Sequence, residues 1–130
     1  MDERYDEYPS VCIDLKKSRV RIHKKMIHQM NDPQYIELLV NPKKKCFIVR
    51  IAPERKTSHR IMIDMLAEKQ QCCELYSREF IREIQKVGKN LRSLQSYRII
   101  GRFSADRSAA RFILKDAQLI ETGKEDVLYA

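Results

Sequence analysis

Hydrophobic and polar residues alternate in short runs through the first half of the chain. Residues 11–15 (VCIDL) and 19–22 (RVRI) place a hydrophobic side chain at every second position. A period of two is typical of strands with one buried face, so both runs are predicted to be β-strands. Two further β-rich runs flank the turn signal Asn-Pro-Lys-Lys-Lys, which predicts a hairpin over about 35–52.

Helical spacing replaces this alternation in three segments. Residues 24–30 (KKMIHQM) space their hydrophobic side chains as a short helix does, and the NDP sequence after them ends it. Residues 66–76 (LAEKQQCCELY) are predicted to be helical as well. The strongest helix signal covers residues 78–87, because Ser77 is a favourable N-cap and Gly88 stands where a helix commonly ends.

The last third of the chain returns to strand patterning. Residues 96–103 (SYRIIGRF) and 109–115 (AARFILK) alternate around SADRS, which predicts a second hairpin. Residues 117–121 (AQLIE) are predicted to add an edge strand, and residues 59–65 (HRIMIDM) to form a short strand earlier in the chain. The second hairpin would gather four basic side chains on one face: Arg98, Arg102, Arg111 and Lys115. No internal repeat is recognisable in the sequence.

These elements predict an α+β fold, in which an antiparallel sheet with hairpins packs on a helical middle segment. At 130 residues the chain has the length of one domain with a sizeable core. Residues 1–10 (MDERYDEYPS) are acidic, and we expect them to form a mobile tail in front of a single domain over 11–130.

Composition places the chain among globular proteins. Hydrophobic residues make up 43% and charged residues 34% of the sequence. No apolar run approaches the roughly 20 residues needed to cross a bilayer, and the acidic start is unlike a signal peptide. We therefore expect a cytoplasmic protein without a membrane partner.

The net charge gives the first indication of a partner. The formal charge is +8 at pH 7, and the sequence pI is about 9.4. Such a charge favours phosphate groups, whether on a nucleic acid, on a nucleotide or on the acidic surface of another protein. The net charge alone does not distinguish among these three kinds of partner.

Catalytic and metal-binding patterns are not recognisable. His23 and His59 each stand beside Lys or Arg, His28 stands between Ile27 and Gln29, and no Ser-His-Asp or Cys-His arrangement is visible. The four cysteines include no C-x-x-C, and only three glycines are present, which excludes a glycine-rich phosphate loop. We therefore predict a binding protein without enzyme activity, metal or cofactor.

The stretch around the second hairpin is the best candidate for an anion site. Arg107 and Arg111 flank the turn, and two guanidinium groups in this arrangement can close on one phosphate. Ser108 and the free N–H groups of the turn would add donors. The alternative is that these arginines keep an exposed hairpin soluble. Phe80 is a candidate for stacking on a base, although its helical spacing with Ile84 also suits the core.

Two partial resemblances to known protein families add to these indications. Residues 13–30 (IDLKKSRVRIHKKMIHQM) and 35–50 (YIELLVNPKKKCFIVR) resemble the half-barrel of AbrB-type transition-state regulators. In that family a basic strand leads into a short helix and a hairpin, and dimers exchange hairpins to bind DNA. The resemblance implies a DNA-binding regulator, with four residues matching the basic strand: Arg19, Arg21, Lys24 and Lys25.

The second resemblance is to the phage-encoded Thoeris anti-defence proteins. These proteins form oligomers and capture a cyclic ADP-ribose signal without degrading it, in a pocket with an aromatic residue, an asparagine and several arginines. Residues of these types occur here at similar spacing, namely Arg55, Phe80, Asn90, Arg107 and Arg111. The resemblance implies that these five residues bind a small phosphate-bearing nucleotide.

Three functions are therefore weighed. The first is an anti-defence sponge, from a phage or mobile element, that sequesters a cyclic nucleotide signal as a homo-oligomer in the cytoplasm of a bacterial host cell. The second is an AbrB-like DNA-binding transcription regulator. The third is a protein inhibitor of a bacterial defence nuclease, which would use its basic surface to block contacts with nucleic acid.

Overall fold

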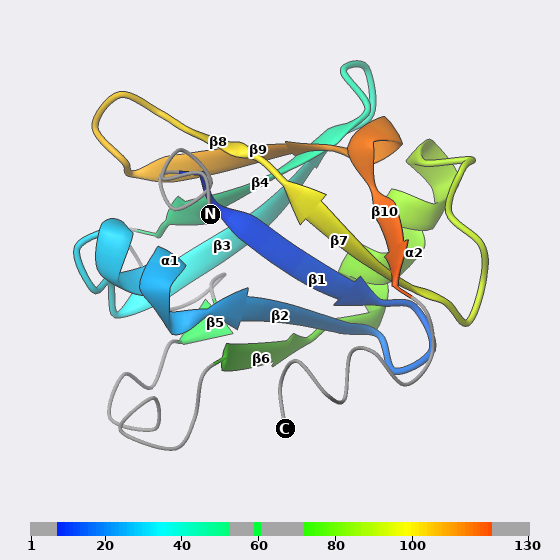
Figure 1. Cartoon of the computed structure of the whole chain (residues 1–130), viewed down its shortest axis with the longest axis horizontal. Helices are drawn as coiled ribbons and strands as arrows, with labels where there is room; N and C mark the ends of the chain where they lie inside the picture. Colours follow the sequence, from blue (N-terminus) through cyan, green and yellow to red (C-terminus); the bar gives the residue numbers. More distant parts are fainter. Residues whose placement is uncertain (1–7, 53–58, 61–71, 121–130) are drawn as a thin grey trace.

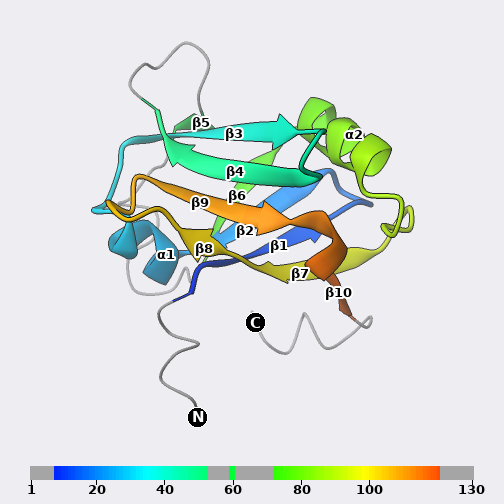
Figure 2. The ribbon, with the colours of Figure 1, turned by 90° about the horizontal axis from the view of Figure 1, so that it is seen from above.

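The described part of the chain folds into two stacked antiparallel sheets. The structure, a computed structural model, describes residues 8–52, 59–60 and 72–120. Figure 2 shows the two sheets as layers, with helix α1 at one end of the stack and helix α2 at the other. Figure 1 shows the same arrangement from the side of the sheet that contains β1 and β2.

Each sheet contains strands from both halves of the sequence. Sheet A has the order β10 (Gln118–Ile120), β7 (Ser96–Ile100), β1 (Ser10–Asp14), β2 (Arg19–His23), β6 (Cys72–Tyr76). Sheet B has the order β5 (His59–Arg60), β3 (Tyr35–Asn41), β4 (Cys46–Ile51), β9 (Ala109–Ile113), β8 (Arg102–Phe103). The helices are α1 (Lys24–Gln29) and α2 (Arg78–Val87), and a 3₁₀ turn covers Leu114–Asp116.

Most predicted elements are confirmed. The fold is α+β with antiparallel hairpins, and the predicted strands over 11–15 and 19–22 are β1 and β2. The hairpin over 35–52 is β3 and β4, and the edge strand at 117–121 is β10. The Ser77 hydroxyl caps α2 by accepting a hydrogen bond from the Phe80 N–H at 3.2 Å.

The helix predicted over 66–76 is wrong where the structure describes it. Residues 72–76 form β6, which pairs along its whole length with β2. Cys73 packs against the core and Leu75 is buried, whereas the alternate residues Glu74 and Tyr76 are exposed. This alternation, supported by pairing with β2, overrides the local helical preference. Of the strand predicted at 59–65, His59 and Arg60 form β5, and the rest lies outside the described residues.

The second hairpin is shorter than predicted, because the chain changes sheets within it. β7 pairs with β1 in sheet A, whereas β8 pairs with β9 in sheet B, and Gly101 lies between them. A Cβ at Gly101 would lie 2.3 Å from the Arg111 carbonyl oxygen, so a glycine permits this close crossing. The prediction that Arg98 shares a face with Arg102 and Arg111 is therefore wrong, because Arg98 belongs to the other sheet.

The boundary predicted for the N-terminal tail also needs correction. β1 begins at Ser10, and the Gly101 N–H donates a hydrogen bond to the Pro9 carbonyl at 2.8 Å. Tyr8 and Pro9 are described as well, and residues 1–7 lie outside the described residues.

The core lies between the two sheets and is centred on aromatic rings. Phe47 of β4 stacks on Phe112 of β9 with ring centroids 5.0 Å apart. It also meets Phe80 of α2 edge-on at 5.3 Å. Phe47 and Phe112 are fully buried, and Phe80 is 6% exposed. Such ring pairs add about 0.5–1.5 kcal/mol beyond the burial of their area.

The strands pair as though the chain contained two similar halves. Residues 10–51 run in the order β1, β2, α1, β3, β4, and residues 59–113 repeat this order, with the third strand divided into β7 and β8. β2 pairs antiparallel with its counterpart β6, and β4 pairs with its counterpart β9. β1 pairs with β7, and correspondingly β5 pairs with β3. These pairs match those of a local twofold axis, except that β1 also pairs with β2, whereas β5 and β6 lie in different sheets.

The helices of the two halves share a burial pattern, although no repeat is recognisable in the sequence. Each half buries two neighbouring apolar residues and a third residue three positions later. These are Met26, Ile27 and Met30 in the first half and Phe80, Ile81 and Ile84 in the second. The residue types differ at nearly every position, so the halves share spacing and burial rather than sequence.

Within the described ranges, no helix combines the length and apolar character that crossing a bilayer requires.

Candidate functional site

The residues predicted to form one ligand site are spread over the molecule. Arg55 lies outside the described residues. Phe80 packs in the core against Phe47. Asn90 is exposed as a residue, but its side-chain amide donates a hydrogen bond to the Leu114 carbonyl at 3.0 Å and so connects the loop after α2 to the end of β9.

Phe80 and Arg111 lie on opposite faces of sheet B. Ala110 and Phe112 are buried on the inner face, so Arg111 between them projects outward and is exposed. Phe80 contacts the inner face through Phe47. The described members of the predicted set therefore do not line a common pocket, and the role of Phe80 is to fill the core.

Arg107 lies in the turn between β8 and β9, where its φ of 58° is in the left-handed region. Its guanidinium carbon is 5.4 Å from the centre of the Phe103 ring. The Ser108 donors that were expected to serve a phosphate are directed at Asp106 instead. The Asp106 carboxylate accepts from the Ser108 N–H at 3.0 Å and from the Ser108 hydroxyl at 2.7 Å.

These hydrogen bonds make Asp106 the organising residue of the turn. Bonds from Ser108, with a further one from the Ser104 hydroxyl at 2.8 Å, lower the pKa of Asp106 to about 2. The carboxylate therefore stays ionised throughout the physiological range, and it opposes rather than assists anion binding at the turn.

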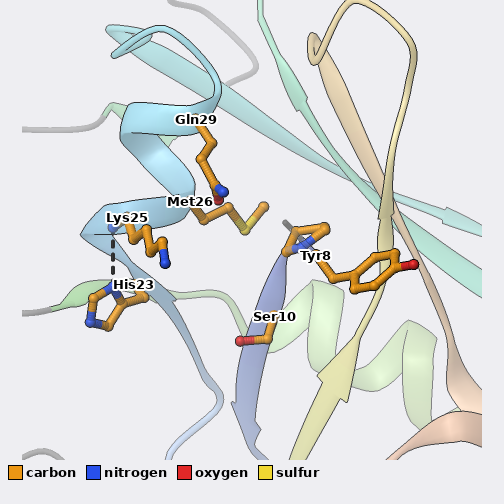
Figure 3. Close-up of a pocket in the computed structure, with 7 residues that line it drawn as sticks. Tyr8, Ser10, His23, Lys25, Met26 and Gln29 are labelled. Atoms are coloured by element: carbon orange, nitrogen blue, oxygen red, sulfur yellow. Dashed lines mark hydrogen bonds between the residues drawn. The ribbon is translucent and has the colours of Figure 1, made fainter. Parts of the chain in front are cut away.

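A pocket elsewhere combines polar and apolar walls. It has a volume of about 280 Å³ and lies between α1 and the chain that leads into β1. Figure 3 shows Lys25, Met26 and Gln29 projecting from α1 toward the segment that carries Tyr8 and Ser10. The lining residues are Tyr8, Pro9, Ser10, His23, Lys25, Met26 and Gln29.

His23 joins β2 to α1 and supports the polar wall. Its Nδ1 accepts a hydrogen bond from the Lys25 N–H at 3.1 Å, which caps the helix. Burial lowers the pKa of His23, and the charges of Lys24 and Lys25 lower it further. The imidazole is therefore neutral at pH 7, and Lys25 supplies the positive charge among the described residues that line the pocket.

The opposite wall is tied to the C-terminal hairpin. The Arg102 guanidinium carbon lies 5.2 Å from the centre of the Tyr8 ring, a cation–π geometry. The hydrogen bond from Gly101 to Pro9 holds the two segments together next to this contact. Sequence reasoning missed this wall because Tyr8 and Pro9 were assigned to the tail, and no local pattern indicates their contact with residues 101–102.

The arginines expected to face DNA are part of an ion-pair network on sheet A. Arg19 is 7% exposed, and its Nη2 lies 2.9 Å from an Asp14 carboxylate oxygen. Glu74 lies 3.3 Å from Arg19 and 3.1 Å from Arg21. The Tyr76 hydroxyl also donates to Glu74, at 2.9 Å.

The network keeps Arg19 and Glu74 ionised. Burial would lower the pKa of Arg19, but Glu74, Tyr76 and Asp14 together raise it above its usual value. Burial would likewise raise the pKa of Glu74, but the hydrogen bond from Tyr76 and the charges of Arg19 and Arg21 leave it lowered. Arg19 and Arg21 thus have a structural role in the fold.

The four cysteines are fully or partly buried. Burial raises the pKa of Cys72 to about 11, so its thiol is protonated at pH 7 and is a poor nucleophile. Cys12 and Cys46 are buried and form no disulfide. Over the described ranges, no three His, Cys, Asp or Glu side chains lie close enough together to hold a metal ion.

No family model, curated protein or solved structure matches this chain.

The histidine at the pocket predicts a pH dependence of stability. Because the pKa of His23 is lowered in the fold, the unfolded chain takes up a proton more readily as pH falls below the ordinary value of 6.5. The stability that the neutral imidazole provides is thus complete above pH 6.5 and is lost as pH falls through the lower pKa of the folded protein. His23→Asn retains a capping acceptor but does not titrate.

We therefore expect the stability difference between the native protein and His23→Asn to shift in favour of the variant as pH falls from 7.5 to 5. Urea unfolding at a series of pH values measures this difference. Since His28 and His59 are present in both proteins, their contributions cancel. Parallel stability curves for the two proteins would show that His23 is not the titrating group.

Proposed function

We propose that this protein binds a small phosphate-bearing nucleotide in the pocket between α1 and the start of β1, and releases it unchanged. The observation that carries the proposal is the pairing of two unlike walls. Lys25, Gln29 and Ser10 offer a cation, an amide and a hydroxyl, while Pro9 and Met26 offer apolar surfaces. Tyr8 stands at the edge of this wall, with its ring directed away from α1 (Figure 3). A nucleotide has the matching parts, a phosphate for one wall and a planar base for the other.

The size of the pocket supports a ligand of this class. Ligand pockets usually enclose roughly 300–1,000 Å³, and this one, at about 280 Å³, falls just below that range. It is suited to one nucleotide rather than to a larger cofactor. The described residues that line it include no carboxylate or thiol, which supports binding without chemical conversion.

The proposal retains the function implied by the anti-defence resemblance but moves the site. Sequestration of a cyclic nucleotide signal, in the cytoplasm of an infected bacterium, requires a cationic pocket and no catalytic group. The set Phe80, Asn90, Arg107 and Arg111 does not supply such a pocket within one chain, whereas the residues around Lys25 do.

Native mass spectrometry with a nucleotide panel tests the proposal directly. The panel contains the common mononucleotides, cyclic mononucleotides and cyclic ADP-ribose, and bound material is released by heat and identified by chromatography. We expect one nucleotide per chain, recovered unaltered, and the same spectra report whether the protein is an oligomer. Recovery of a converted nucleotide would indicate an enzyme, and an empty protein would contradict nucleotide binding.

A charge-removing variant locates the site. Lys25→Gln removes the cation of the pocket, and we expect it to weaken nucleotide binding about tenfold, which corresponds to a charge-assisted hydrogen bond of about 1.4 kcal/mol. Isothermal titration calorimetry measures the change. Lys43→Gln, in the exposed turn between β3 and β4, removes the same charge away from the pocket and serves as the control. Equal weakening by both variants would mean that only net charge matters.

DNA binding is the second candidate, favoured by the order of elements in the first half. Residues 10–51 run strand, strand, short helix and hairpin, which is the order implied by the AbrB resemblance. Arg19 and Arg21 are held by acidic partners, so Lys24 and Lys25 would have to provide the contacts to DNA. Retardation of duplex DNA that falls steeply as salt rises would favour this candidate over the nucleotide.

A further inference from the structure

We infer that Arg102 and Arg111 form a second anion site beside the pocket, and that the ligand is a nucleotide with two linked phosphate groups. This inference rests on the proposed function, because it adds a subsite to the same pocket. It begins from the pairing of β8 with β9, in which Arg102 and Arg111 stand directly opposite each other.

Direct opposition places the two side chains on one face of the sheet. Residues paired in this way in an antiparallel sheet have Cα atoms roughly 4.5–5.5 Å apart, so their side chains emerge together. Both arginines are exposed, and each carries a full positive charge. Two like charges in this position repel each other, and an anion bound between them would remove that repulsion.

The described surroundings do not neutralise this pair. Arg19, Arg21 and Arg50 each lie within 3.3 Å of an Asp or Glu oxygen. By contrast, neither Arg102 nor Arg111 forms an ion pair with any residue that the structure describes. The acidic residue of the same hairpin, Asp106, keeps its charge but accepts its hydrogen bonds from Ser104 and Ser108 in the turn rather than from Arg102 or Arg111.

The pair is connected to the pocket through Tyr8. The guanidinium of Arg102 lies over the Tyr8 ring at 5.2 Å, and Tyr8 is itself a lining residue of the pocket. The hydrogen bond from Gly101 to Pro9 fixes the start of β8 against the same segment. Arg102 thus lies beside a residue that lines the pocket, and Arg111 stands opposite Arg102 on the neighbouring strand.

The chemistry of the pair selects the ligand class. Guanidinium groups present paired N–H donors that match the oxygens of a phosphate, and two of them suit the dense charge of a second phosphate. The pocket has room for about one nucleotide, so a second phosphate would extend out of it. The fit is to nucleoside diphosphates and to nucleotides bridged by a pyrophosphate.

The test compares nucleoside monophosphates with the corresponding diphosphates. Dissociation constants are measured by calorimetry for AMP, GMP, CMP and UMP and for ADP, GDP, CDP and UDP. We expect the preferred diphosphate to bind at least tenfold more tightly than its monophosphate. In Arg111→Gln the ratio of the two constants should fall below threefold, whereas in Arg92→Gln, an exposed arginine in the loop after α2, it should remain above tenfold.

The possible outcomes separate the two proposals. A monophosphate that binds as tightly as its diphosphate would overturn the second site and leave the pocket standing. The second site would also be overturned if Arg111→Gln, shown to be folded by thermal unfolding, still bound the diphosphate tenfold more tightly than the monophosphate. If no member of the panel binds, the proposed function fails, and the second site fails with it.

Discussion

Replacing Asp14 with alanine is expected to lower the free energy of unfolding by about 3 kcal/mol. The Asp14 carboxylate holds Arg19, whose side chain is almost completely buried, and it also accepts hydrogen bonds from the Lys16 and Lys17 N–H groups at 3.0 and 3.1 Å. Removing one partner of a buried ion pair typically costs 3–5 kcal/mol, roughly the cost of leaving a charge buried alone. Because Arg19 keeps its contact with Glu74 at 3.3 Å, we expect a loss of stability at the lower end of this range.

Urea unfolding of Asp14→Ala measures this loss, and two further variants identify its cause. Asp14→Asn retains an acceptor for the turn but not the charge, so it should lose most of the same stability. Glu37→Gln breaks an ion pair with Arg50, whose side chain is 48% exposed, and should cost no more than about 1 kcal/mol. If Asp14→Asn is as stable as the native protein, the turn rather than the charge accounts for the effect.

Replacing Gly101 with alanine is expected to destabilise the protein by about 3 kcal/mol, the upper end of the range for overpacking. The added Cβ would lie 2.3 Å from the Arg111 carbonyl oxygen, and 2.6 and 2.8 Å from two carbons of the Phe112 ring. The oxygen belongs to the backbone of β9, so the clash cannot be relieved by turning a side chain. The crossing from sheet A to sheet B would have to open.

Gly88→Ala provides a matched control for this variant. Its Cβ would lie 3.0 Å from a terminal carbon of Leu91 and 3.2 Å from the Ile84 carbonyl oxygen, and its φ of −93° is accessible to alanine. The cost should stay below about 1 kcal/mol, because a flexible side chain can give way. Since Gly101 also holds Pro9, Gly101→Ala should weaken nucleotide binding as well. Equal stability of the two variants would contradict the importance of the crossing.

The sequence was most informative where neighbouring residues determine the structure. The N-cap Ser77 and the helical spacing of Phe80 and Ile84 predicted α2 correctly, because a helix is stabilised by contacts within a few residues. The strand at Cys72–Tyr76 was missed because it depends on pairing with β2, far away in the sequence. The bend at Gly101 was missed because the alternation of hydrophobic residues continues through it.

The candidate site was less predictable than the fold. The sequence placed Arg102 and Arg111 on one face of the second hairpin, and the register of β8 and β9 sets them directly opposite each other. The pocket includes Tyr8, whose ring contacts Arg102 from a strand more than 90 positions later in the sequence. Side chains brought together by long-range pairing give no periodic signal in the sequence.

The twofold arrangement of the strands has a further consequence for specificity. In a dimer of identical chains, any residue change at one helix start appears at the other as well. Here both helices belong to one chain, so the two starts have diverged: α1 carries Lys25 and Gln29, whereas α2 carries the exposed Glu79 and Glu83 at the corresponding positions. The two helix starts therefore present different charges to a ligand, and one ligand per chain is the natural stoichiometry.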